Sequence, residues 1–191
     1  MPGIVGLLLA AGLGRRFGGD KLLHPLADGT AMAVRAAANL RPACDRVVAV
    51  VRPGHEPLAR LLAAAGCEIV YCPDAEQGMG RTLAAGVQAS ADAGAWIVAL
   101  GDMPFIAPGS HQAVASSLGA GASLAATEYR GRRGHPVGFA REWFAQLSAM
   151  TGDQGGRAIL ASHPERLVLC PVEDGGVVWD IDHPGDLPEQ R

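Results

Sequence analysis

The stretch from Leu7 to Lys21 reads LLLAAGLGRRFGGDK and decides the fold class. Its first part is a short apolar run that ends in small residues, as a buried parallel strand does. Its second part is a glycine-rich loop that carries Arg15 and Arg16 and ends at Lys21. Glycines let backbone N–H groups approach phosphate oxygens, and the cations offset the phosphate charge. The stretch therefore predicts a polyphosphate site at the carboxyl edge of a parallel sheet.

Spacing excludes two other glycine-rich loops. A P-loop ends in Gly-Lys-Ser/Thr, but Lys21 follows Asp20 and precedes Leu22. A dinucleotide-binding fingerprint needs G-x-G-x-x-G, but the interval from Gly14 to Gly18 is one residue too long. A flexible turn without a ligand remains the alternative, and the three cations of the loop argue against it.

The rest of the chain alternates between apolar runs and helical patterns. The expected strands cover residues 4–10, 46–51, 68–71, 95–100, 123–127, 135–139 and 166–172. The expected helices cover residues 30–39, 56–65, 82–91, 108–118, 141–150 and 156–162. We expect a basic turn at 130–134 and, after an extended segment at 179–182, a short tail helix. This alternation predicts one α/β domain, residues 1–191, with a mainly parallel sheet, helices on both faces and ligands beyond the carboxyl ends of the strands.

Composition limits the classes of function. The 191 residues are 49% apolar but only 5% aromatic, so we expect a core of Ala, Val, Leu and Ile. The net charge of −3 argues against nonspecific nucleic-acid binding. No apolar run approaches the ~20 residues of a membrane span, and no charged leader precedes the first strand. We expect a cytoplasmic protein that binds neither nucleic acid nor membrane.

The four cysteines form no metal or redox motif. Cys44, Cys67, Cys72 and Cys170 include no Cys-x-x-Cys pair, and no suitably spaced histidine pair accompanies them. We therefore expect reduced, mostly buried thiols, as in a cytoplasmic protein.

Asp102 is a candidate metal ligand. It follows the apolar run 95–101, and Pro104 stiffens the turn after it. A carboxylate at the end of a buried strand has little freedom, and Mg²⁺ takes one or two carboxylates together with substrate phosphates. A turn or helix-cap aspartate is the alternative.

A second acidic cluster lies near the end of the chain. In an extended segment, Asp180 and Asp182 point to the same side and repel each other unless a cation lies between them. We expect Asp186 to be the N-terminal cap of the tail helix.

The segment from Leu9 to Lys21 resembles the signature loop of the MobA-like nucleotidyltransferases, roughly L-A-A/G-G-x-S-x-R-M-G-x-x-K. The chain departs from that pattern at Gly14, often serine, and at Phe17, often methionine. The resemblance implies a Rossmann-like, glycosyltransferase-A-like nucleotidyltransferase fold, with Arg16 and Lys21 as catalytic residues. It also implies that the nucleotide is bound by Leu9, Ala10, Ala11, Gly12, Gly14 and Arg15.

Three later segments resemble the family in matching order. Residues 77–87 resemble G-M-x-x-S-L-x-x-G. This implies that Gly78 and Thr82 bind the nucleotide, beside the free N–H groups at the start of a helix. An ordinary capped helix without a ligand is the alternative. Residues 100–105 resemble the metal motif, so Asp102 becomes both catalytic and a ligand of Mg²⁺. Residues 180–187 resemble the closing motif D-I-D-T-P-x-D-L, which makes Asp182 a second metal ligand and leaves the share of Asp180 open.

Two segments resemble the acceptor region of the family. Residues 130–139 resemble G-R-R-G-x-P-V-x-F, and residues 152–157 resemble G-D-x-G-A-R. In the molybdenum-cofactor cytidylyltransferases these regions meet the pterin acceptor, which implies acceptor binding by Arg133, His135, Asp153 and Arg157. A solvated hairpin and a helix cap are the respective alternatives.

The resemblance thus implies a Mg²⁺-dependent nucleotidyltransferase that joins a nucleotide to a molybdopterin-type acceptor, with transient contact to a client molybdoenzyme. Ala11 favours CTP, because related guanylyltransferases tend to carry glycine at this position and the methyl group of alanine would crowd a purine. If Ala11 only packs against a helix, its methyl group says nothing about the base. The alternatives are guanylyl transfer to the same cofactor, transfer to a sugar or polyol phosphate, and a nucleotide-binding chaperone that delivers cofactor.

Overall fold

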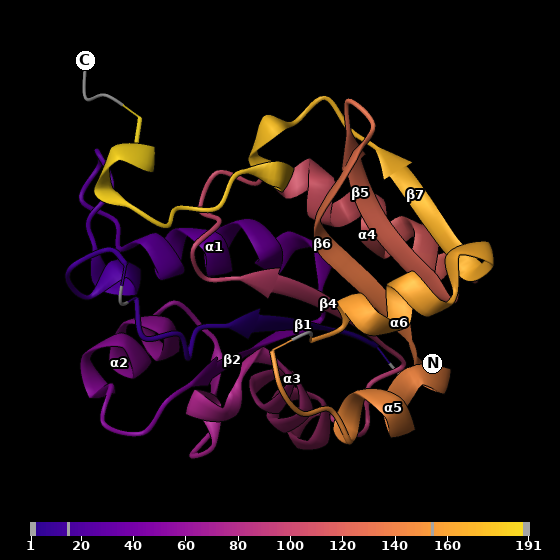
Figure 1. Ribbon diagram of the computed structural model, residues 1–191, viewed down its shortest axis with the longest axis horizontal. Coiled ribbons are helices and arrows are strands. Elements are labelled where there is room, and N and C mark those ends of the chain that lie inside the picture. Colours follow the sequence, from indigo (N-terminus) through magenta and orange to yellow (C-terminus); the bar gives the residue numbers. More distant parts are fainter. Residues whose placement is uncertain (1–2, 15, 154, 189–191) are drawn as a thin grey trace.

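The computed structural model describes residues 3–14, 16–153 and 155–188. Its strands are β1 (Ile4–Leu9), β2 (Arg46–Val51), β3 (Glu68–Tyr71), β4 (Ala95–Leu100), β5 (Leu124–Tyr129), β6 (Arg132–Ala140) and β7 (Leu167–Pro171). They form one seven-stranded sheet in the order β3-β2-β1-β4-β6-β5-β7 (Figure 1). Strands β1 to β4 are parallel, β7 is parallel to β5, and β6 is antiparallel to both of its neighbours.

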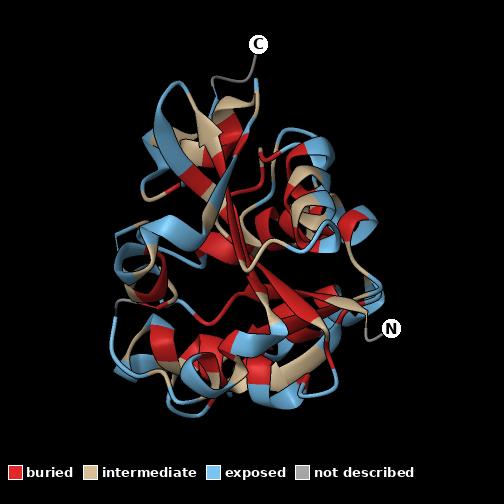
Figure 2. Ribbon diagram, turned by 90° about the vertical axis from the view of Figure 1, so that its right-hand side faces the viewer, coloured by how far each residue is buried: buried red, intermediate tan, exposed pale blue. Residues whose placement is uncertain are grey.

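Helices cover both faces of this sheet. They are α1 (Met32–Leu40), α2 (Glu56–Ala64), α3 (Met79–Ala89), α4 (Pro108–Gly119), α5 (Phe144–Ser148) and α6 (Arg157–Ser162). Helices α1, α2 and α4 share one core with Leu8, whereas α3, α5 and α6 share the other with Leu7 and Leu9. Buried residues accordingly follow the central strands and the inward sides of the helices (Figure 2). The expected α/β architecture is confirmed.

The antiparallel hairpin is longer than the sequence predicts. Its turn contains only Arg130 and Gly131, with φ values of +50° and +75°. Positive φ at both central residues gives a twist that matches paired strands, so the ladder resumes at once with Arg132 opposite Tyr129. The expected five-residue turn at 130–134 is therefore wrong, and Arg132, Arg133 and Gly134 belong to β6.

Helix α3 begins one turn earlier than the predicted start at residue 82. Gly78 has a φ of +116°, and the Gly80 N–H donates to the Gly152 carbonyl at 2.8 Å. The Gly152 carbonyl takes the place of a capping side chain. The residue that caps the helix is therefore far from the helix start in the sequence, where no local pattern announces it. Thr82 consequently lies inside the helix, where its side chain is buried.

Two other expected helices are shorter. Residues 24–31 form a small hairpin, with a bridge between Pro25 and Ala31, so α1 begins at Met32. The helix expected at 141–150 divides into a 3-10 turn (Arg141–Trp143) and α5. The indole N–H of Trp143 fixes that turn by donating to the Ser123 carbonyl at 3.1 Å.

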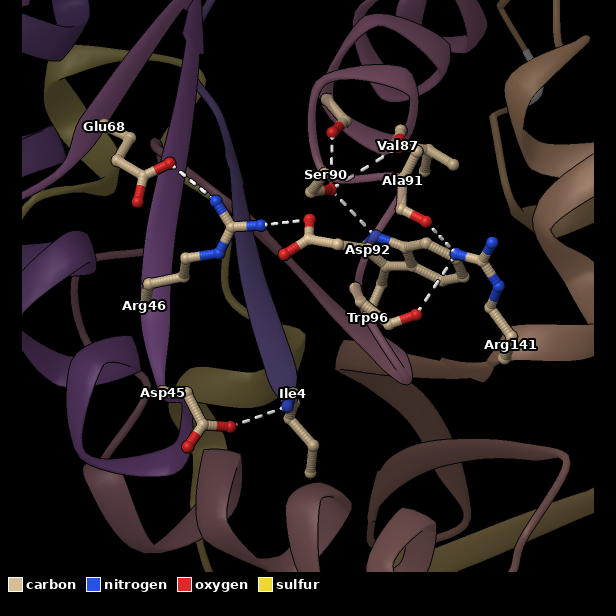
Figure 3. A network of polar contacts seen from close by, with 12 residues as sticks. Ile4, Asp45, Arg46, Glu68, Val87, Ser90, Ala91, Asp92, Trp96 and Arg141 are labelled. Carbon is tan, nitrogen blue, oxygen red and sulfur yellow. Dashed lines mark hydrogen bonds and ion pairs between the residues drawn. The ribbon is translucent and has the colours of Figure 1, made fainter. Parts of the chain in front are cut away.

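Polar side chains tie the amino ends of the strands together, opposite the edge where ligands are expected (Figure 3). Asp45 Oδ2 accepts from the Ile4 N–H at 2.7 Å, at the start of β1. Arg46, the first residue of β2, pairs with Glu68 at 2.8 Å and with Asp92 at 2.5 Å. This network fixes the amino edge and leaves the carboxyl edge free for a site.

Two further features concern the length of the helices and the state of the cysteines. No helix in the described part of the chain is long and apolar enough to cross a membrane. All four cysteines are free, and only Cys44 is not fully buried. Burial raises the pKa of the Cys44 thiol to about 12.

Candidate active site

The loop after β1 bends back on itself and delivers Lys21 to the carboxyl edge of the sheet. Gly14 has a φ of +59°, in the left-handed region that favours glycine. A Cβ atom there would lie 3.1 Å from the Cβ of Lys21. The Lys21 N–H donates to the Gly19 carbonyl at 3.0 Å, and only 8% of Lys21 is exposed. The resembling loops often have serine at position 14. Here the positive φ and the close approach of Lys21 explain why the residue is glycine.

Lys21 lies between two carboxylates that come from distant parts of the chain. Its Nζ is 2.8 Å from Asp102 Oδ2 and 3.2 Å from Asp182 Oδ1. Arg16 contacts the other oxygen of Asp182 at 2.5 Å. Burial lowers the pKa of Lys21, but hydrogen bonds and charges from the two aspartates outweigh it, so the pKa is raised overall. The ammonium group is therefore a permanent cation at neutral pH.

The closing segment places Asp182 against this cluster. Buried Ile181 anchors the segment, and its N–H donates to the Asp102 carbonyl at 3.0 Å. Asp186 Oδ2 accepts from the N–H groups of Asp182 at 2.9 Å and His183 at 2.7 Å. Asp186 is the last residue of the 3-10 helix Pro184–Asp186, so the prediction that it is the N-terminal cap is wrong. It reaches back across the turn and orients Asp182.

Asp180 differs from Asp182 in its surroundings. It is exposed, and within the described ranges it forms no ion pair, whereas Asp182 is half-buried against Lys21. The charge of Asp180 instead contributes to the electrostatic environment of His135.

The oxygen donors of Asp102 and Asp182 suit a divalent cation. Both carboxylates converge on one cationic group, which shows that they share a single position for positive charge. Hard ions such as Mg²⁺ take one or two carboxylates and complete their shell with water and substrate phosphates. Among the described residues no cluster of three or more potential ligands occurs, so the remaining ligands would come from a substrate.

A cleft of about 560 Å³ lies over this cluster, a volume typical of small-ligand sites. The sequence-predicted residues on its wall are Leu9, Ala11, Gly12, Gly14, Arg16, Lys21, Gly78, Thr82, Asp102 and Asp182. Ala10 does not join them, because it is fully buried and its N–H donates to the Val50 carbonyl. Arg15 lies outside the described residues. We call this space the first cleft.

A second cleft of about 610 Å³ adjoins the first and contains all four predicted acceptor residues, Arg133, His135, Asp153 and Arg157. Its floor is apolar, with Val137 and Phe139 from β6 and Leu160 from α6. Two guanidinium groups above an apolar floor suit a planar anion. Asp153, Leu9 and Met79 line both clefts, so the two spaces share a wall.

Comparison with known families agrees with this geometry. A sequence model of the MobA-like NTP transferase domain matches residues 6–167. The chain belongs to the MobA-like NTP transferase family. The matched range includes the glycine loop, Asp102 and both acceptor segments, whereas Asp182 lies beyond it.

Two curated proteins are similar over nearly their whole length. Purine catabolism protein PucB of Bacillus subtilis is 28% identical, with 100% of this chain and 97% of PucB covered. Nicotine blue oxidoreductase of Paenarthrobacter nicotinovorans is 31% identical, with 95% of this chain and 93% of the relative covered.

Solved structures share the fold. Rv0371c of Mycobacterium tuberculosis is 26% identical, with a TM-score of 0.79 over 97% of this chain and 95% of the other, and it has also been solved in complex with manganese. A nucleotidyl transferase from Methanothermobacter, Mth528, has a TM-score of 0.81 at 20% identity, over 96% and 94% of the two chains. Family and fold together establish a MobA-like nucleotidyltransferase.

In this MobA-like chain, two glycines at the start of α3, one just before the helix and one inside it, allow the wall between the clefts to close. A Cβ on Gly78 would lie 2.5 Å from Asp153 Oδ1, and one on Gly80 would lie 2.7 Å from the Thr151 carbonyl oxygen. The expected free N–H groups at this helix start are partly occupied, because Gly80 donates to Gly152 and Arg81 donates to Gly78. Glycine here serves close packing of the 151–153 loop.

His135 enters the second cleft as a neutral ring. Burial lowers its pKa, and this effect exceeds the opposing influence of a hydrogen bond with the Val98 backbone and of the Asp102 and Asp180 charges. Its Nδ1 is buried and has no hydrogen-bond partner in the described structure. The ring of this cleft-lining residue therefore has one buried polar atom without a partner.

Several wall residues were not predicted. The first cleft also contains Leu13, Glu76 and Met79, and the second also contains Phe139 and Leu160. Glu76 had a usable signal, since it is an acidic residue directly before the glycine-rich start of α3. The apolar residues had none, because a cleft wall and a core position look alike in sequence.

Proposed function

We propose that this protein transfers a nucleoside monophosphate from an NTP, preferably CTP, to the phosphate of a molybdopterin-type acceptor in the cytoplasm, with release of pyrophosphate. The observation that carries the proposal is the position of Lys21, Asp102 and Asp182 in a first cleft that shares the Asp153 wall with an arginine-lined second cleft. A triphosphate and an anionic acceptor can therefore meet at one place.

The reaction is an in-line displacement at phosphorus. An oxygen of the acceptor phosphate forms a bond to the α-phosphorus, the bond from the α-phosphorus to the bridging oxygen breaks, and pyrophosphate leaves with that electron pair. Lys21 and Arg16 face the triphosphate and offset the charge that develops on the leaving group. The protein contributes position and electrostatics, without a covalent intermediate on a side chain.

Asp102 and Asp182 are the residues that would hold Mg²⁺, which supplies charge neutralisation at the phosphates. The manganese complex of Rv0371c supports a divalent-metal requirement for this fold. Here the two aspartates also orient Lys21, since each accepts a hydrogen bond from its Nζ.

The second cleft supplies acceptor recognition. Arg133 and Arg157 suit an acceptor phosphate, and Asp153 accepts hydrogen bonds from the donor edge of a pterin. The apolar floor at Phe139 suits a planar ring. Client contact with a molybdoenzyme would follow product formation at this cleft.

Ala11 supports the preference for CTP. It lines the first cleft and is 5% exposed, so its methyl group narrows the site. One methyl group in a close-packed site discriminates by ~1–3 kcal/mol, about 10- to 200-fold. A purine would be disfavoured to that extent.

Competition between CTP and GTP at equal concentration, with Mg²⁺ and molybdopterin, tests the proposal. We expect pyrophosphate release and predominantly CMP transfer. Predominant GMP transfer would show that GTP, not CTP, is the preferred nucleotide. Transfer only to a sugar or polyol phosphate would show that molybdopterin is not the acceptor. Binding without pyrophosphate release from any NTP would indicate a cofactor-delivery protein. Because one relative is named an oxidoreductase, a parallel assay uses reduced nicotinamide dinucleotide and a redox dye; turnover there alone would overturn the transferase reaction.

A further inference from the structure

A short connection on the next strand holds both ends of the glycine loop. Residues 52–55 join β2 to α2, directly beside the loop of residues 12–20 that follows β1. Arg52 Nη1 donates to the Gly12 carbonyl at 2.9 Å, where the loop starts. His55 Nε2 lies 2.5 Å from Asp20 Oδ2, where the loop ends. One four-residue segment thus contacts the loop at its first and last turns.

The loop needs such support because it makes few contacts of its own. It lies outside the sheet, most of its described residues are exposed, and its glycines carry positive φ at positions 14 and 18. A glycine-rich segment loses much conformational entropy when it is ordered, so external bonds are required to hold one geometry. Its internal backbone bonds include Phe17 N–H to Gly14 O and Lys21 N–H to Gly19 O, both at 3.0 Å.

His55 is buried more deeply than the loop that it contacts. His55 is 4% exposed and precedes the first turn of α2, where its carbonyl accepts from the Ala59 N–H at 3.1 Å. The helix start therefore fixes the backbone of His55, and burial restricts its ring. The acid that it holds, Asp20, is directly before Lys21 in the chain, so a shift of Asp20 would move the lysine that faces Asp102.

We propose that Arg52 and His55 are positioning residues that hold the glycine loop in the geometry required for triphosphate binding. Neither residue lines the first cleft, so neither would touch the NTP. They act through Gly12 and Asp20. This inference rests on the proposed function, because it concerns the site of the same NTP.

The proposal predicts a specific loss of nucleotide affinity. Without one of these bonds the loop samples other geometries, and part of the NTP binding energy is used to order it. We expect the Kd and KM for Mg-CTP to rise about tenfold, the scale of one charge-assisted hydrogen bond. The KM for the acceptor should not change, because no residue of the 52–55 connection lines the second cleft.

The test compares His55→Leu with His55→Gln, whose amide can still donate to Asp20, by calorimetric titration with Mg-CTP and by pyrophosphate release. His55→Leu should lose affinity and His55→Gln should recover most of it. An Asp20→Ala change should cause a similar loss, and the double variant Asp20→Ala, His55→Leu should be no worse than either single variant. Equal CTP affinity in wild type and His55→Leu, or additive losses, would overturn the proposal.

Arg52→Met has a matched control in Arg41→Met. Arg41 Nη1 donates to the Gly66 carbonyl at 2.8 Å, the same kind of bond away from both clefts. Only Arg52→Met should weaken CTP binding, and equal losses would overturn a specific role for Arg52.

Amide hydrogen exchange in a peptide covering residues 12–20, measured without nucleotide, gives a second readout. Exchange should accelerate in His55→Leu and not in His55→Gln. Unchanged exchange in His55→Leu would contradict the positioning role of His55, even if that variant had lost CTP binding. If the wild-type protein binds no NTP, the proposed function and this inference both fail. If it binds NTP and only the variant differences are absent, this inference alone fails.

Discussion

Lys21 Nζ lies 2.8 Å from Asp102 Oδ2, although 81 positions separate the two residues in the chain. Lys21 is also the only lysine of the protein, so no neighbouring ammonium group can replace it. In this arrangement Lys21, which would bind the triphosphate, neutralises Asp102, which would bind the metal. Metal and nucleotide should therefore bind cooperatively, because each releases a partner for the other.

Replacing Asp102 with asparagine should abolish activity without unfolding the protein. Asparagine keeps the shape of the side chain but removes the negative charge that a divalent cation requires. Since metal stabilisation of a transferring phosphoryl group is worth several kcal/mol, we expect pyrophosphate release to fall at least about a hundredfold. Circular dichroism should be unchanged. Turnover near the wild-type rate at ordinary Mg²⁺ concentration would contradict the metal assignment.

Replacing Lys21 with alanine should affect nucleotide and metal in opposite directions. NTP affinity should fall by ~1.5–3 kcal/mol, the range of a charge-assisted hydrogen bond. Binding of Mn²⁺ in the absence of nucleotide should become tighter, because Asp102 and Asp182 lose the cation that they share. Paramagnetic resonance titration with Mn²⁺ measures the second effect. Weaker Mn²⁺ binding in the variant would show that Lys21 does not compete with the metal.

Replacing Arg157 with alanine should impair use of the acceptor and not of the NTP. Arg157 lines only the second cleft, so its guanidinium group would meet the acceptor phosphate. We expect the KM for molybdopterin to rise about tenfold, while the KM for CTP stays within twofold. Arg60→Ala is the control, since Arg60 is exposed on α2 and lines neither cleft. A comparable loss of CTP binding without acceptor would move Arg157 into the nucleotide site.

The sequence predicts the bounds of three parallel strands well because their signal is local. The runs 46–51, 68–71 and 95–100 match β2, β3 and β4 at both ends. The buried parts of β2 and β4 are continuously apolar, and polar or glycine residues mark their limits, whereas β3 is a short, half-exposed edge strand. The cations of the glycine loop and Asp102 were found for the same reason, because each directly follows such a run.

The contacts that complete the site have no local signal. His55 reaches Asp20 across 35 positions, and the Gly152 carbonyl caps a helix that starts at Met79. Tertiary pairing also decided where β6 begins, since a two-residue turn returned Arg132 to the sheet. A single sequence shows that a residue is polar or small, but its partner is fixed only when distant segments pack.

Replacing Gly80 with alanine should destabilise the wall between the clefts. Its Cβ would lie 2.7 Å from the Thr151 carbonyl oxygen, closer than such atoms approach in folded proteins. Overpacking of this kind typically costs ~1–3 kcal/mol. Gly109 is the matched control, because it is likewise the second residue of its helix, and a Cβ there meets nothing within 4 Å. Urea unfolding should show a loss for Gly80→Ala and little change or a gain of up to ~1 kcal/mol for Gly109→Ala. Equal stability of the two variants would contradict the close approach.

The buried histidine of α4 should make folding stability depend on pH. His111 is 1% exposed, and burial lowers its pKa to about 4, an effect that exceeds the opposing charge of Asp174. In the unfolded chain a histidine titrates near 6.5, so between about pH 4 and 6.5 the unfolded state binds more protons and stability rises with pH. Above that range the contribution is complete and constant. A pKa shift of this size corresponds to about 3 kcal/mol of unfolding free energy. The lowered pKa of His135 adds a dependence of stability on pH that has the same sign. Urea unfolding at several pH values between 4.5 and 7.5 measures the slope, and His111→Gln should reduce it without removing it, because His135 remains. An identical slope in wild type and variant would show that His111 has the same pKa in the folded and the unfolded protein, so that its burial does not hold it neutral.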